Sequence, residues 1–184
     1  MNIDAQIKNA DGVDFDANTA VLIIGAGACG LTAALAARDA HVETVLLERD
    51  ASASGSTSLS SGMIPAAGTL AQSRAGINDS SALFAADIQA KAHGEAPPEL
   101  VRTVSEQAGP AIDWLAQTHG VTLDVVTGFL YPGHAVARMH APPSRTGGEL
   151  HAALANAASC SICSPVRLLL SCSKCSCHLF AALV

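Results

Sequence analysis

Three regularly spaced glycines form the pattern in this chain that most directly suggests chemistry. They are Gly25, Gly27 and Gly30, in the segment GAGACG that also contains Ala26 and Cys29. At this spacing the first glycine permits a tight turn, the second lets a pyrophosphate approach the backbone, and the third lets a helix pack closely on a strand. The helix would begin with free N–H groups and the positive end of its dipole, which attract phosphate. The pattern therefore predicts a dinucleotide-binding turn.

An acidic residue, Glu48, lies 18 positions after Gly30. A carboxylate at the end of the second strand of such a unit accepts hydrogen bonds from the adenosine ribose hydroxyls. It also repels a 2′-phosphate, which disfavours NADP, although the neighbouring cation Arg49 acts in the opposite sense. We interpret Cys29 as a small residue that fills space in the turn. The alternative interpretation of the whole pattern is an ordinary βαβ unit with a glycine-rich turn.

The hydrophobic pattern predicts the elements that would position these residues. Residues 20–25 are a short apolar run rich in β-branched side chains, typical of a buried parallel strand. A helix is predicted over 31–40 and a second buried strand over 42–47. Residues 51–69 form a Ser- and Gly-rich loop, and Met, Ile and Pro at 63–65 indicate that it is packed rather than free. The predicted fold class is α/β, a Rossmann-like FAD/NAD(P)-binding domain with an incomplete parallel sheet and added helical segments.

Further elements are predicted downstream. A helix capped by Asp79 or Ser80 should run to about residue 93. Pro97-Pro98 should open another helix, with Leu100, Val101 and Val104 as its apolar stripe, an interruption at Gly109-Pro110 and an end at Gly120. We expect a strand over 121–126, a loop over 127–147 and a short helix over 148–158.

Composition limits the classes of function. The 184 residues carry a net charge of −6 and no cluster of Lys or Arg, which argues against a nucleic-acid surface. The polar, acidic start lacks the features of a signal peptide, and no uninterrupted apolar run reaches the roughly 18 residues of a membrane helix. We therefore expect a cytoplasmic protein without a membrane span or nucleic-acid partner.

The loop after the second predicted strand resembles a known family. Residues 48–69 match, through Gly55, Ser56, Thr57, Ser60 and Gly62, the Gly/Ser stretch of flavoproteins in the fumarate reductase/succinate dehydrogenase group. In that group the stretch wraps the pyrophosphate, ribityl chain and flavin edge of FAD. The match departs at Ser54 and Ser61, where the family usually has glycine. Ser56 stands where some members carry a histidine bonded to the flavin, so the resemblance implies FAD held non-covalently.

The resemblance covers roughly residues 19–158 and implies a reaction. Members of the group transfer a hydride at a carbon–carbon bond next to a carbonyl or carboxylate, with a small-molecule substrate and an electron donor or acceptor as partners. The segments that supply most of their catalytic groups are not found in this chain, so no catalytic residue is assigned. We expect a truncated flavoprotein that could be inactive alone. The first alternative is an NAD-dependent dehydrogenase with the same glycine pattern.

The densest cationic cluster of the matched region is His134, Arg138 and His140. These side chains could bind the carboxylate or carbonyl of a substrate. Alternatively, they belong to a solvated loop with structural hydrogen bonds.

The last 26 residues differ in composition from the rest. None is Gly, Asp or Glu, and eleven are Ser or Cys, including Cys160, Cys163, Cys172, Cys175 and Cys177. The two CxxC pairs could bind zinc, so the second alternative function is a zinc-binding or redox module in this tail. However, the eight residues between the pairs are a short separation for a zinc ribbon. We prefer an unnatural or out-of-frame ending. The predicted division is a flexible leader at 1–18, an FAD-binding domain at 19–158 and a tail at 159–184.

Overall fold

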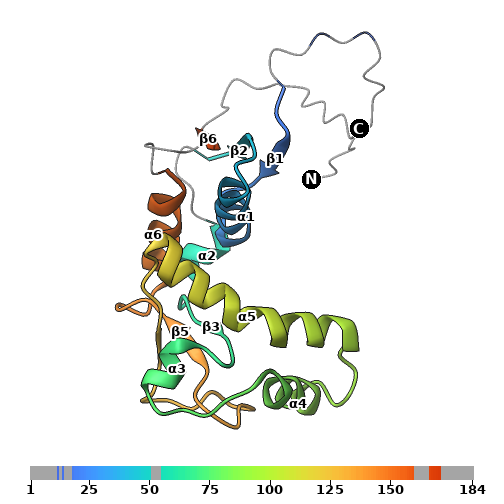
Figure 1. Cartoon of the computed structure of the whole chain (residues 1–184), viewed down its shortest axis with the longest axis vertical. Helices are drawn as coiled ribbons and strands as arrows, with labels where there is room; N and C mark the ends of the chain where they lie inside the picture. The colour runs from blue at the N-terminus through green and yellow to red at the C-terminus, as the bar shows by residue number, and fades with distance from the viewer. Residues whose placement is uncertain (1–11, 13, 15–17, 51–54, 160–165, 171–184) are drawn as a thin grey trace.

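A parallel sheet lies at one end of the molecule in the computed structural model, which describes residues 12, 14, 18–50, 55–159 and 166–170 (Figure 1). The sheet has the order β1-β2-β6, from β1 (Val21–Ile24), β2 (Thr44–Glu48) and β6 (Val166–Leu170). Both pairings are parallel, with Ile24 beside Leu47 and Glu48 beside Leu170. Both predicted strands and the parallel α/β class are confirmed, but β1 is not the buried strand that the sequence predicts: three of its residues are half-buried and Ile24 is 72% exposed. Strand β6 falls in the predicted tail, so part of that segment belongs to the sheet.

Two helices build the core around this sheet. Helix α1 (Ala28–Asp39) connects β1 to β2, and α6 (Gly147–Ser159) lies beside α1. Buried leucine and alanine residues of the two helices form this core, and the small alanine side chains let the helices approach closely. The buried members on the two helices are Leu31, Ala34, Leu35, Leu150, Leu154 and Ala158. The helix predicted over 31–40 is confirmed, although it begins earlier because Gly27 serves as its N-cap.

A second, antiparallel sheet lies toward the other end of the molecule (Figure 1). Its order is β3-β5-β4, from β3 (Ile64–Pro65), β5 (Met139–Ala141) and β4 (Asp124–Val125). Strand β5 lies within the predicted loop over 127–147, and β4 is shorter than the strand predicted over 121–126. These strands are too short for a clear period-two pattern, which explains why the sequence did not define them.

Helices α3 (Leu70–Arg74) and α4 (Ser81–Lys91) belong to this end of the molecule, while α2 (Gly55–Leu59) packs on α6. The Ser80 side chain accepts a hydrogen bond from the Leu83 N–H, which confirms the predicted cap of α4. At α3, the Thr69 side chain accepts from the Gln72 N–H and the Gln72 side chain accepts from the Thr69 N–H. This reciprocal capping fixes the start of a five-residue helix.

Helix α5 (Pro98–His119) is continuous, so the predicted interruption at Gly109-Pro110 is wrong. Apolar residues before and after Pro110 lie on one face, and their burial outweighs the hydrogen bond that proline cannot make. The predicted stripe is also wrong for Leu100 and Val104, which are 60% and 40% exposed. The buried face instead comprises Val101, Ser105, Gly109, Ile112 and Leu115. The helix ends at Gly120 in the left-handed conformation, as predicted.

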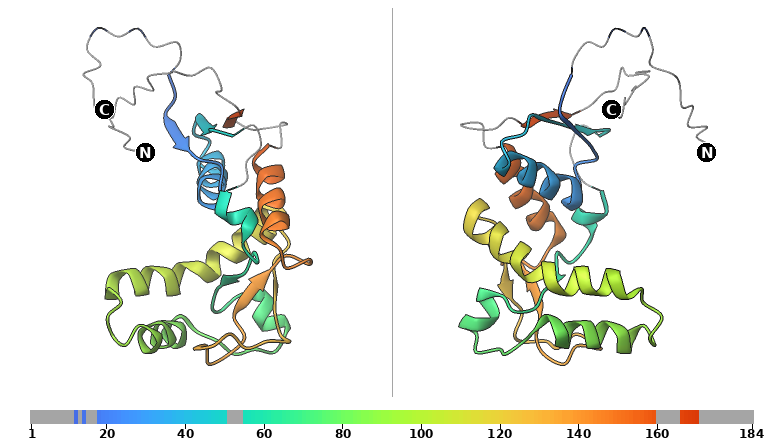
Figure 2. Two further views of the ribbon diagram at one scale, coloured as in Figure 1. Left: turned by 180° about the vertical axis from the view of Figure 1, so that it is seen from behind. Right: turned by 45° about the vertical axis from the view of Figure 1, so that its right-hand side comes forward.

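Helix α5 connects the two ends of the molecule, as the two views of Figure 2 show. One end of α5 lies beside α4 and the other approaches α1. At the latter end Asp39 accepts hydrogen bonds from Trp114 Nε1 at 2.8 Å and from His119 Nε2 at 3.0 Å. These bonds fix the carboxyl end of α1 against the end of α5.

Several expectations fall outside the described residues. They include most of the predicted leader and all five cysteines of the tail. Within the described part, no helix combines the length and hydropathy that crossing a membrane requires. That part also lacks any cluster of three or more metal-ligating side chains.

Candidate nucleotide-binding turn

The turn after β1 has the backbone geometry that its glycines predict. Gly25 has a φ of +98°, a conformation that favours glycine, and its N–H donates to the Leu47 carbonyl at 2.7 Å. A Cβ at Gly30 would overlap the Gly25 carbonyl oxygen and lie 3.2 Å from Ile23 Cγ2. Gly30 therefore allows α1 to lie directly against the turn. The described structure places the three glycines at a strand-to-helix junction.

Gly27 is the N-cap of α1, and its contacts differ from those of the other two glycines. A Cβ there would meet only Thr57 Oγ1, at an ordinary 3.6 Å, among the described atoms. Neighbouring side chains therefore do not require glycine at this position. The first N–H groups of a helix have no acceptor within the helix, so the backbone here can present donors to a ligand that approaches closely.

Glu48 lies at the opening of the turn. Its Oε2 accepts a hydrogen bond from the Ala26 N–H at 2.8 Å, and its Oε1 accepts from the Asp50 N–H at 3.1 Å. These backbone hydrogen bonds, with that from Ala26 the largest cause, lower the pKa of Glu48 below its usual value of 4.5. The side chain is consequently an ionised, acceptor-only group beside the N-terminus of α1.

Arg49 and Cys29 contribute little to the interior of the turn. The Arg49 side chain is 90% exposed and pairs with Asp50 at 3.2 Å. Cys29 is exposed in the first turn of α1, so its interpretation as a space-filling residue is wrong. The helical rotation directs position 29 away from the core that Ala26 and Leu31 enter.

The Ser/Gly loop reaches the turn through Thr57. The Ala28 N–H donates to Thr57 Oγ1 at 3.0 Å, so a residue of α2 caps the first turn of α1. Gly55 and Ser56 are exposed at the start of the same short helix. The segment predicted as a loop over 51–69 contains α2 and β3, and its residues 63–65 are half-buried, in agreement with the predicted packing; residues 51–54 lie outside the described residues.

The end of this loop packs against the start of α6. The Gly147 N–H donates to the Ser60 carbonyl at 2.8 Å, and a Cβ at Gly147 would overlap the Thr57 carbonyl oxygen. Gly62, with a φ of +64°, lies against Thr146. Sequence reasoning did not assign Gly147 this function, although its place in a Thr-Gly-Gly run before a helix is a signal for close approach.

His151 is a second residue of α6 that the sequence did not single out. Its side chain is buried, and Nε2 lies 2.8 Å from the Ala26 carbonyl oxygen. Ala26 is thus held on both sides, by Glu48 at its N–H and by His151 at its carbonyl. One sequence feature could have indicated His151: it follows Gly147 by four residues, which places both residues on one face of a helix.

The predicted substrate cluster lies away from the turn, at the end of the molecule that contains α4 and β5. Arg138 is fully buried. Its guanidinium donates to both oxygens of Asp79, at 2.9 and 3.0 Å, and to Asp87 at 2.5 Å. The cation also lies 4.8 Å from the centre of the Phe84 ring. Arg138, Asp79 and Asp87 therefore form a buried ion cluster, not a solvated loop. Substrate binding by Arg138 stays a prediction.

The two histidines of this cluster are also partly or fully enclosed. His140 Nδ1 donates to the Arg138 carbonyl at 3.0 Å, so Nε2 accepts from the Thr69 hydroxyl at 2.7 Å. Burial lowers the pKa of His140, and burial together with the Arg138 charge lowers the pKa of His134. Both are therefore neutral near pH 7, which weakens the attraction that a substrate carboxylate would feel.

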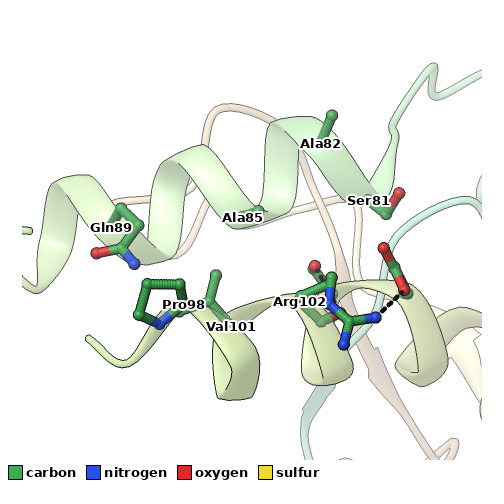
Figure 3. A pocket seen from close by; sticks show the side chains of 9 residues that line it. Ser81, Ala82, Ala85, Gln89, Pro98, Val101 and Arg102 are labelled. Atoms are coloured by element: carbon green, nitrogen blue, oxygen red, sulfur yellow. Dashed lines mark hydrogen bonds and ion pairs between the residues drawn. The ribbon is translucent and has the colours of Figure 1, made fainter.

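A separate pocket of about 270 Å³ lies between α4 and α5 (Figure 3). Ser81, Gln89 and Arg102 line it, together with apolar residues of both helices. Glu99 and Glu106 engage the Arg102 guanidinium, at 3.3 and 3.6 Å. The pocket is distant in the fold from the turn after β1, and none of the predicted site residues lines it.

The donor and acceptor groups of the turn fit the adenosine diphosphate half of a dinucleotide. Backbone N–H groups at the start of α1 suit the phosphates, and the ionised Glu48 suits ribose hydroxyls, which donate hydrogen bonds. The two groups are adjacent because Glu48 binds the Ala26 N–H. Gly27 has no side chain that would stand between its backbone and a pyrophosphate.

Comparison with known families agrees with this geometry. A family described as an FAD binding domain matches residues 20–169. The match includes β1, α1, β2 and the elements that follow. It also extends beyond residue 158, where the sequence resemblance was expected to end.

Similar proteins include reductases with far longer chains. The NADH:fumarate oxidoreductase of Klebsiella pneumoniae (strain 342) is 34% identical over 132 residues, which are 71% of this chain and 14% of that protein. The urocanate reductase of Eggerthella lenta is 34% identical over 71% of this chain and 21% of its own length. The chain therefore spans about a fifth or less of either relative.

Solved structures show the same fold. The open conformation of a flavocytochrome c3 fumarate reductase superposes with a TM-score of 0.71 and 30% identity, over 82% of this chain and 26% of that one. The 3-ketosteroid-Δ4-(5α)-dehydrogenase from Rhodococcus jostii RHA1 gives a TM-score of 0.70 at 21% identity, over 86% of this chain and 39% of its own.

Proposed function

The chain belongs to the family of FAD-binding domains that matches residues 20–169, and from this premise we propose that its Gly25–Gly30 turn binds the pyrophosphate of non-covalently held FAD. The observation that carries the proposal is the hydrogen bond between Glu48 and the Ala26 N–H, 2.8 Å long. This contact supports the proposal because it holds a carboxylate, which suits ribose hydroxyls, close to the N–H groups at the start of α1. A dinucleotide needs those two groups side by side.

Each residue of the turn has a distinct function in this proposal. The Gly27 N–H and the N–H groups of the first turn of α1 other than that of Ala28 bind phosphate oxygens, and Glu48 binds the ribose hydroxyls. Thr57 holds the first turn of α1 through the Ala28 N–H. Ser60 and Gly62 connect this loop to α6. Arg49 would remain near the adenosine, at the surface.

We extend the proposal to the reaction. FAD, when bound, supplies two-electron chemistry as an acceptor or donor of hydride. Relatives named fumarate reductase and urocanate reductase support a substrate with a carbon–carbon bond next to a carbonyl or carboxylate. The described residues include no assigned catalytic acid or base. The chain would therefore contribute cofactor binding to such a reaction. We further propose that an electron donor or acceptor is its partner and that it is located in the cytoplasm.

Ligand-dependent stability tests the proposal directly. A ligand that binds the folded state raises the free energy of unfolding, by about 2.7 kcal/mol at a concentration of 100 times its Kd. The melting temperature rises as a result. We expect FAD to raise the melting temperature of the 184-residue chain, and ADP to do so more weakly. NADP should have little effect because of Glu48. A denaturing step should release all flavin from the protein if the cofactor is non-covalent.

The comparison of ligands also separates the alternatives. Stabilisation by NAD without stabilisation by FAD would favour the dehydrogenase alternative. No stabilisation by any of these dinucleotides would contradict nucleotide binding by this chain. As a matched pair of variants, Glu48→Gln should weaken FAD binding, whereas Glu95→Gln should not. Glu95 is an exposed carboxylate in the loop after α4 and serves as the control.

A further inference from the structure

We infer that His151 is a positioning residue for the phosphate-binding backbone, an inference that rests on the proposed binding of FAD. His151 lies on α6, far from the turn in sequence, and it touches the turn at a single polar atom. Its Nε2 lies 2.8 Å from the Ala26 carbonyl oxygen. Because a carbonyl oxygen can only accept a hydrogen bond, Nε2 carries a proton and is the donor of this hydrogen bond.

The direction of this hydrogen bond determines where the next N–H points. The Ala26 carbonyl and the Gly27 N–H belong to the same peptide unit, and the described chain contains no cis peptide bond. In a trans peptide, the C=O and the N–H point in opposite directions. A histidine that holds the Ala26 carbonyl on one side therefore directs the Gly27 N–H to the other. That N–H is the first donor at the start of α1.

The surroundings of His151 make this orientation rigid. The side chain is only 7% exposed, and Leu150 and Leu154 of the same helix belong to the apolar core. The Ala26 N–H is bound to Glu48, so the peptide groups on both sides of Ala26 are fixed. A rigid donor needs no reorganisation when an anion binds.

Water is an inadequate substitute for the histidine at this position. Ala26 is fully buried, so without His151 its carbonyl would lose its partner in the core. The peptide between Ala26 and Gly27 could then rotate to find another donor. Rotation would turn the Gly27 N–H away from the phosphate. His151 would thus act on phosphate affinity without touching the ligand.

The test compares ligands that contain or lack the pyrophosphate. We expect His151→Leu to weaken binding of FAD and ADP by about tenfold, the equivalent of one hydrogen bond to a charged group. Adenosine, which lacks phosphates, should bind as it does to the unmodified chain. His151→Gln retains a donor and should recover most of the ADP affinity. Titrations by calorimetry or fluorescence give all three affinities.

His119→Leu is the matched control. The His119 side chain is also buried and hydrogen-bonded to its neighbours, but His119 is the last residue of α5 and contacts Asp39 at the carboxyl end of α1, away from the turn. We expect this variant to lower the melting temperature and to leave the ratio of ADP to adenosine affinity unchanged. If His151→Leu also leaves that ratio unchanged, the inference is wrong. If the unmodified chain binds neither FAD nor ADP, the proposed function fails instead.

A measurement on the unmodified chain covers the case in which His151→Leu does not fold. In nuclear magnetic resonance spectra, the His151 imidazole should carry its proton on Nε2, and ADP should shift the Gly27 amide resonance strongly. A proton on Nδ1 alone, or a Gly27 amide that does not respond to bound ADP, would overturn the inference.

Discussion

At the scale of single residues, the two most informative glycines are those that the backbone itself requires. Gly25 adopts a positive φ, and Gly30 lies so close to the Gly25 carbonyl that a Cβ would overlap it. The sequence predicted both through the spacing of the glycines. The sequence could not predict the hydrogen bond between His151 and Ala26, because this contact depends on how α6 packs on α1.

The first prediction concerns Gly30. We expect Gly30→Ala to destabilise the fold by about 1–3 kcal/mol, since the nearest atom, the Gly25 carbonyl oxygen, is backbone that cannot move aside. It should also weaken FAD binding, because the start of α1 would shift away from β1. Denaturant unfolding and a flavin titration measure the two effects.

Gly148→Ala is the control for this prediction. Position 148 is in α6, and an added Cβ there would meet nothing within 4 Å. Alanine favours a helix over glycine by up to about 1 kcal/mol, so this variant should be as stable as the unmodified chain or more so. Equal stability of the two alanine variants would contradict the close packing described at Gly30.

At the scale of elements, α4 and β5 are joined by buried charges. Arg138 precedes β5, Asp87 lies on α4, and Asp79 lies just before α4. Burial of Asp87 acts to raise its pKa, but hydrogen bonds from the Ala135 N–H and Arg138 outweigh this effect and lower it. The Asp87 carboxylate is thus charged, and it shares the Arg138 guanidinium with Asp79.

The second prediction follows from this cluster. We expect Arg138→Met to destabilise the fold by about 3–5 kcal/mol, because it leaves two carboxylates without their cation in a buried place. Arg102→Met should change stability by no more than about 0.5 kcal/mol, since Arg102 is 60% exposed. Urea unfolding of both variants provides the comparison.

The same variant separates a structural function of Arg138 from substrate binding. A destabilised Arg138→Met protein with unchanged FAD affinity agrees with the ion cluster. Stability close to that of the unmodified chain, together with lost affinity for a dicarboxylate such as fumarate, would contradict it and support the predicted contact with substrate.

Helices and strands were predictable from sequence where their run of apolar residues was long or where capping residues marked their ends. The β1–α1–β2 unit, the Ser80 cap and the Gly120 end follow from apolar runs and capping residues. The continuity of α5 through Pro110 was not predictable, because tertiary burial on one face overrides the local preference. Strands β3 and β5 are brief, and antiparallel partners from distant segments define them.

At the scale of the whole molecule, α5 connects the end that contains the β1-β2-β6 sheet to the end that contains α4 and β5. Its last turns contact α1 through Trp114 and His119, which both donate to Asp39. Arg38 extends the contact by donating to the Ala157 carbonyl of α6 at 2.6 Å. Trp114 is the single tryptophan of the chain, so its fluorescence reports on this junction.

The third prediction uses that reporter. In the unmodified chain, unfolding followed by Trp114 fluorescence and by far-ultraviolet circular dichroism should coincide, because one cooperative unit contains both signals. Asp39→Ala removes the acceptor that Trp114 and His119 share. The fluorescence transition should then occur at lower urea concentration than the circular dichroism transition. Asp124→Ala, an exposed site in β4, should leave the two transitions together. Coincident transitions in Asp39→Ala would show that apolar packing around Ile112 and Leu115, rather than the Asp39 hydrogen bonds, couples the two ends.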